Sequence, residues 1–78
     1  MNPREVIEHL HPNVFAPSLF VTLDGAAYEV RHPELATVTE HGTLIIYFLA
    51  SPDDVRVDDW VKIGCRNLML IRPTTRNS

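Results

Sequence analysis

The chain has 78 residues, seven basic and ten acidic side chains, a formal net charge of −3 and one cysteine, Cys65. This length allows a single domain that buries roughly 60% of the surface of its unfolded chain, so that self-association is a common source of further stability. The lone cysteine excludes an intrachain disulfide, and the negative charge argues against broad binding to nucleic-acid phosphates.

The N-terminal segment predicts a short helix over residues 3 to 10. Asn2 is a good N-cap, a proline follows at the first helical position, and Glu5 is placed to complete a capping box. Pro12 ends the helix because proline disfavours α geometry at the preceding residue. The apolar side chains on one side of this helix are expected to pack on a sheet, and they are Val6, Ile7 and Leu10.

Residues 19 to 34 contain the clearest local signal, which is a β-hairpin. Asp24-Gly25 tolerates the positive φ angles of a tight two-residue turn and separates two alternating apolar runs. His32-Pro33-Glu34 then breaks the second strand, since proline cannot donate to a ladder. The predicted pairs, which make one face of the hairpin apolar, are Leu23 with Ala26, Val21 with Tyr28, and Leu19 with Val30.

The third predicted strand, residues 43 to 49, has no polar face. A turn at residues 40 to 42 precedes it, and residues 37 to 39 are expected to be extended. An antiparallel strand with one solvated side should alternate, so both faces of this strand need cover. The helix is expected to cover one face, and a second subunit or the far wall of a closed barrel the other. The residues predicted for an oligomer interface are Ile45, Tyr47 and Leu49.

The rest of the chain predicts two more strands. Residues 51 to 54 form a turn, a strand over residues 55 to 63 is interrupted at Asp58-Asp59, and the last strand covers residues 68 to 72. Residues 1 to 73 are therefore predicted to be one domain, followed by a frayed tail at residues 74 to 78. The predicted fold class is mostly β, with a short N-terminal helix and a five-stranded, strongly bent antiparallel sheet or small barrel.

Two short elements accompany this order of strands: Leu23-Asp24-Gly25 near the first turn and Ile63-Gly64-Cys65-Arg66-Asn67 before the last strand. In this topology nearly the whole chain resembles the Sm-like and SH3-like small barrels. For Sm-like proteins the resemblance implies a ring whose turn before the last strand reads RNA. The order of Asp-Gly, an aromatic residue and His-Pro-Glu is also similar to that of a group of short, uncharacterised bacterial proteins.

No catalytic, metal or cofactor site is predicted, and no cofactor is expected. The four histidines, His9, His11, His32 and His41, lack the helical i, i+4 spacing of a zinc site. The acidic residues Asp53, Asp54, Asp58 and Asp59 are interpreted as a solvated turn that protects a strand edge. Ser18, Ser51 and Cys65 have no nucleophile signature around them, and Cys65 is expected to be a small buried hydrophobe.

Two functions fit these observations. The first is a self-associating protein-interaction or scaffold module without catalytic activity, and the alternative is an Sm-like protein that binds single-stranded RNA. A cytoplasmic location is expected, because neither a signal peptide nor a membrane span is present. Trp60 is expected to belong to the core in preference to an interface. The candidate residues for contact with a partner or RNA are Arg56, Trp60, Lys62, Arg66 and Asn67, and the basic side chains among them are expected to share a surface with Arg72.

Overall fold

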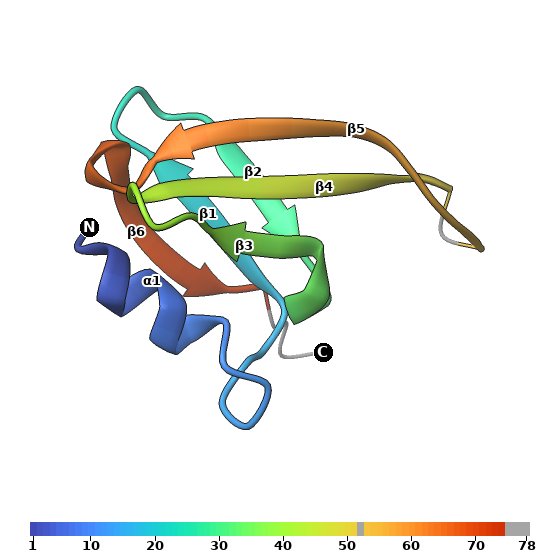
Figure 1. The fold of residues 1–78 in the computed structure, drawn as a ribbon, viewed down its shortest axis with the longest axis horizontal. Helices are drawn as coiled ribbons and strands as arrows, with labels where there is room; N and C mark the ends of the chain where they lie inside the picture. Colours follow the sequence, from blue (N-terminus) through green and yellow to red (C-terminus); the bar gives the residue numbers. More distant parts are fainter. Residues whose placement is uncertain (52, 75–78) are drawn as a thin grey trace.

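A computed structural model describes residues 1–51 and 53–74 of the chain (Figure 1). The described residues form two three-stranded antiparallel sheets, with strand orders β2-β1-β6 and β3-β4-β5. The elements in chain order are α1 (Pro3–His9), β1 (Ser18–Thr22), β2 (Ala27–Val30), the 3-10 turn η1 (Pro33–Leu35), β3 (Ala36–Val38), β4 (Thr43–Ser51), β5 (Asp54–Gly64), the 3-10 turn η2 (Cys65–Asn67) and β6 (Leu68–Pro73).

The predicted fold class is confirmed in its coarse form, since the structure is mostly β with one short N-terminal helix. The prediction of a single five-stranded sheet or barrel is not. The ladders of the described residues form two separate sheets and do not close a barrel. The division occurs at the predicted break around Pro33, where η1 separates β2 from β3. A proline has no N–H to continue the ladder, so the chain leaves the first sheet and begins a new strand in the second.

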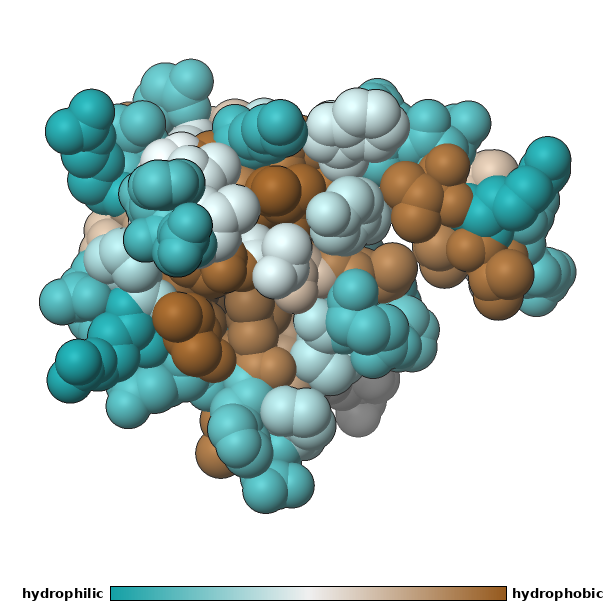
Figure 2. All heavy atoms as spheres, viewed as in Figure 1, coloured by the Kyte–Doolittle hydropathy of each residue, from teal (hydrophilic) through white to brown (hydrophobic). Residues whose placement is uncertain are grey.

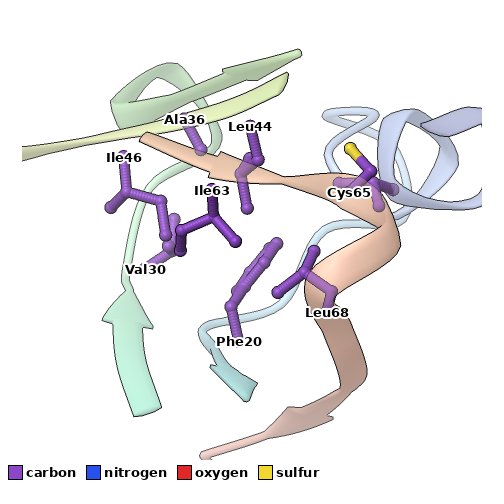
Figure 3. Packing of buried hydrophobic residues seen from close by; sticks show 9 residues of the cluster. Phe20, Val30, Ala36, Leu44, Ile46, Ile63, Cys65 and Leu68 are labelled. Carbon is purple, nitrogen blue, oxygen red and sulfur yellow. The ribbon is translucent and has the colours of Figure 1, made fainter. Parts of the chain in front are cut away.

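The core lies between the two sheets. Figure 3 shows Leu44 and Ile63 of the second sheet pointing toward Phe20 and Leu68 of the first. Leu44 and Ile46 are fully buried on one face of β4. This inner face is therefore covered mainly by the other sheet, whereas the sequence predicted the helix as its cover. The helix contacts β3 and η2 instead.

The helix α1 begins as predicted. The side chain of Asn2 accepts a hydrogen bond from the N–H of Arg4 at 2.8 Å, and Glu5 accepts from the N–H of Asn2 at 3.3 Å, which completes the capping box. Val6 is fully buried, as expected. Ile7 is 53% exposed, so the prediction that it packs on a sheet is wrong. A helix of two turns whose main contacts are with β3 and η2 buries a narrow stripe of side chains.

The first hairpin forms where it was predicted, but its register is shifted by one residue. The N–H of Thr22 donates to the carbonyl of Ala26 at 2.8 Å, and Gly25 has a φ of +93°. The loop therefore contains three residues, with glycine in the left-handed position, where two had been predicted. A shift of one residue exchanges the two faces of a strand. The buried side of β1 thus carries Phe20, and the exposed Leu23 lies in the loop.

The second hairpin, between β3 and β4, closes in the same way. The N–H of Thr39 donates to the carbonyl of Thr43 at 2.8 Å, and that of Gly42 donates to the carbonyl of Thr39 at 3.0 Å. Gly42 also has a positive φ, +80°. The predicted turn at residues 40 to 42 is confirmed, and the predicted extended segment before it forms β3.

The predicted interruption at Asp58-Asp59 is a β-bulge in a continuous strand. Phe48 pairs with Asp59 and Leu49 with Val57, so Asp58 is the extra residue. A bulge inserts a residue without ending the strand, which explains why β5 continues past two aspartates. Pro52, in the predicted turn before β5, lies outside the described residues, as does the predicted tail beyond residue 74. Thr74 itself donates from its N–H to the carbonyl of Pro17 at 3.0 Å.

Candidate interaction surface

The three residues predicted for an oligomer interface lie together on one face of β4. Because Leu44 and Ile46 are buried on the inner face, the alternating residues between and beyond them lie on the opposite face. The register places Lys62, Trp60 and Val57 of β5 directly across from them. We call this surface the outer face, and its members are Ile45, Tyr47 and Leu49 of β4 with Val57, Trp60 and Lys62 of β5.

The outer face is largely apolar, and its side chains on β5 are more exposed to solvent than those on β4. Trp60 is 55% exposed and Val57 48% exposed, whereas the three β4 residues are half-buried. The prediction that Trp60 belongs to the core is therefore wrong. Its position opposite Tyr47 puts its ring on the side of the sheet that faces away from the other sheet. Figure 2 shows apolar surface at the end of the molecule where the β4–β5 hairpin projects.

A groove lies beside β4 on the side away from β5. Its volume is about 640 Å³. Part of β4, residues 47 to 51, forms one wall, and the end of β2 with η1 forms the other. Sequence reasoning missed this groove, because it depends on β3 being only three residues long. The side chains of the second wall are Glu29, Arg31, His32 and Leu35.

The predicted basic surface does not assemble. Arg56 lies near the far end of the β4–β5 hairpin, where its guanidinium donates to both carboxylate oxygens of Asp54, to Oδ1 at 3.2 Å and to Oδ2 at 2.7 Å. Lys62 is six positions further along β5, roughly 20 Å away in an extended strand. Arg72 is on β6, in the other sheet. These cations therefore do not act as one patch.

The turn η2 joins the two hairpin loops at the opposite end of the molecule. The N–H of Leu23 donates to the carbonyl of Asn67 at 2.8 Å, and the N–H of Cys65 donates to the carbonyl of Gly42 at 2.9 Å. A pocket of about 330 Å³ lies on one side of η2 and includes Lys62 and Asn67. A second pocket, of about 410 Å³, includes Arg66 and His41. Three of the five candidate contact residues therefore lie around η2.

The prediction for Cys65 as a small buried hydrophobe is confirmed, because its side chain belongs to the core. Burial raises the pKa of its thiol by disfavouring the charged thiolate, so the group is a poor nucleophile. The four histidines are all exposed. Among residues 1–51 and 53–74, no three histidine, cysteine or acidic side chains cluster as metal ligands would.

In the part of the chain that the structure describes, no helix has the length and apolar character needed to cross a membrane. Comparisons with protein-family models, with curated proteins and with solved structures gave no match to this chain.

Proposed function

We propose that this protein is a self-associating interaction module without catalytic activity, and that the surface it uses is the outer face together with the neighbouring edge of β4. The observation that carries this proposal is the apolar outer face, on which Trp60 and Val57 lie half-exposed beside Tyr47. Large apolar side chains in a contiguous exposed group are typical of interfaces, and tryptophan is frequent among the residues that dominate their energy.

The small size of the core supports the same conclusion. Among residues 1–51 and 53–74, nine buried side chains, Cys65 among them, form the hydrophobic cluster. A core of this size gives a domain of under 80 residues only a few kcal/mol of stability, and association of folded copies adds to it by mass action. Copies that associate through the outer face bury apolar area that the isolated chain leaves in water, so the proposal accounts for both observations.

The experiment is a measurement of solution mass across the micromolar range by light scattering. We expect the wild-type protein to be a dimer or larger. Leu49→Asp should weaken association by at least about tenfold, because a charge is then placed in the apolar interface. Met69→Asp is the matched control, since Met69 is 51% exposed on β6 in the other sheet. A wild-type protein that is monomeric across this range contradicts the proposal.

Within this proposal we also place the chain in the Sm-like or SH3-like class of small barrels. The order of its strands supports this assignment, because β2 and β3 follow each other through the short turn η1 and the last strand, β6, returns to pair with β1. The 3-10 turn η2 before β6 is consistent with it. A crystal structure in which the two sheets share a continuous ladder would support the assignment, and one in which they remain fully separate would contradict it.

Binding of single-stranded RNA is the second candidate function. It is favoured by the two pockets around η2, which gather Lys62, Arg66 and Asn67 at the end of the molecule. The net charge of −3 opposes it, since phosphate contacts supply most of the affinity in such complexes. We therefore expect micromolar or weaker affinity for uridine-rich and adenosine-rich oligonucleotides at physiological salt.

Fluorescence anisotropy at several salt concentrations tests the RNA function. Tight binding that weakens steeply with salt, and that Arg66→Ala removes without unfolding the protein, would establish RNA as the partner. Tight binding that survives Arg66→Ala would place the RNA site away from η2. Arg72→Ala serves as the matched control, because Arg72 is an exposed arginine on β6, away from both pockets.

A further inference from the structure

An open stretch of strand edge lies on β4 beyond the start of β3. The register pairs β3 with β4 only at Leu44, Ile45 and Ile46. β4 continues to Ser51. Among the described strands, β5 is therefore the only neighbour of β4 from residue 47 to residue 51. Figure 1 shows this part of the hairpin extending past the other strands.

The bond that closes the second hairpin loop fixes which peptide groups face the open side. The N–H of Thr39 donates to the carbonyl of Thr43, so Thr43 turns its peptide groups toward β3. Alternate residues of an antiparallel strand face the same neighbour. Tyr47 and Leu49 therefore turn their N–H and carbonyl groups toward the open edge. Within the described part of the chain, no turn or loop backbone group bonds to either of them.

The open edge borders the groove described above, and the groove gives it room for another strand. Phe48 and Leu35 supply apolar surface to the groove, while Arg31 and His32 supply basic groups to its second wall. Arg31 forms an exposed ion pair with Glu29 at 3.2 Å. Exposed ion pairs of this kind contribute little to stability, so Arg31 can change its partner at low cost. The combination of free peptide groups and an apolar groove suits an extended peptide strand.

We infer that a second copy of the chain fills this groove by adding its own β4 antiparallel to residues 47 to 51, about a two-fold axis near Leu49. This inference rests on the proposed self-association. A two-fold axis requires an edge that is complementary to itself. With Leu49 at the axis, Ser51 of the second copy lies opposite Tyr47 of the first. The incoming β4 thus ends one residue before Ile46, where β3 of the first copy begins to pair.

The side chains and charges agree with this arrangement. Phe48 and Ala50 of the incoming β4 point to the groove side, because alternate residues share a face. Tyr47 and Leu49 of one copy meet those of the other on the outer face, and these contacts bury part of the apolar area that a single copy leaves in water. The acidic end of the second copy's β4–β5 hairpin, with Asp53 and Asp54, reaches the end of the groove near η1, where Arg31 and His32 provide the opposite charge.

Hydrogen exchange read by NMR over a concentration series tests the pairing. We expect the amides of Tyr47 and Leu49 to exchange about tenfold more slowly once nine copies in ten are paired. The amide of Lys62 is the internal control. Lys62 pairs with Ile45, which faces β3, so the Lys62 amide faces the outer edge of β5 and should exchange equally fast at all concentrations.

Two variants separate edge pairing from other modes of association. Ala50→Lys places a charge at the groove of the second copy and should weaken association by about tenfold or more. Val55→Lys, at an 89% exposed position on the same hairpin, should leave association unchanged. Protection of Lys62 in place of Tyr47 and Leu49, or association that Ala50→Lys does not change, overturns edge pairing and leaves self-association standing. A monomer at every concentration overturns both.

Discussion

Gly25 offers a test of the loop geometry in the first hairpin, through the substitution Gly25→Val. The φ of Gly25 is +93°, in a region that costs residues other than glycine about 1–2 kcal/mol and β-branched residues more. A Cβ at this position would meet no heavy atom within 4 Å, so the whole cost is conformational. We expect a loss of at least about 1–2 kcal/mol in the free energy of unfolding, which is about 4–8 °C in Tm for each kcal/mol.

Urea unfolding followed by circular dichroism measures this loss, and two comparisons identify its cause. Gly25→Asn should lose clearly less than Gly25→Val, because asparagine tolerates left-handed backbone. Gly42→Ala should lose more than Gly25→Ala, since a Cβ at Gly42 would lie 3.2 Å from Cγ of Pro3. An unchanged midpoint for Gly25→Val, or equal losses for Val and Asn, would refute the assigned backbone geometry.

Three further outcomes follow from the fold. Phe20→Ala should cost about 3–5 kcal/mol of stability and Leu19→Ala much less, and denaturant unfolding that shows the reverse would restore the register predicted from the sequence. The hydrogen bond from Thr22 lowers the pKa of Asp24, so NMR titration of Thr22→Val should show this pKa moving up toward its ordinary value. Because the pKa is lowered in the folded state, the stabilisation is present above the pKa of the unfolded chain and is lost as the pH falls through the folded value. The thiol of Cys65 should react with Ellman's reagent only as fast as the protein opens, and immediate reaction of the folded protein would show that the thiol is exposed.

Local features of the fold could be predicted from the sequence where one or two residues determine the backbone. Asn2 and Glu5 cap the helix as expected, and Gly25 and Gly42 occupy turns. The register of the first hairpin could not be read in the same way. Apolar side chains occur on both faces of β1, so either register buries some of them, and the choice depends on whether Thr22 closes a loop of three residues.

The candidate surface could be predicted only in part. The lack of a polar face on β4 indicated that Ile45, Tyr47 and Leu49 need cover, and the structure places them on one face. The exposure of Trp60 depends on its register with Tyr47, which no local pattern contains. The groove depends on how far β3 extends along β4, and that length is set by long-range pairing after the break at Pro33.

Sedimentation velocity of the wild-type chain across the micromolar range tests the central claim of self-association most directly. The account predicts a sedimentation coefficient that rises with concentration toward that of a species with at least twice the monomer mass, and a rise that Leu49→Asp shifts to higher concentration. A single monomeric boundary at every concentration, identical in the wild type and in Leu49→Asp, would contradict it.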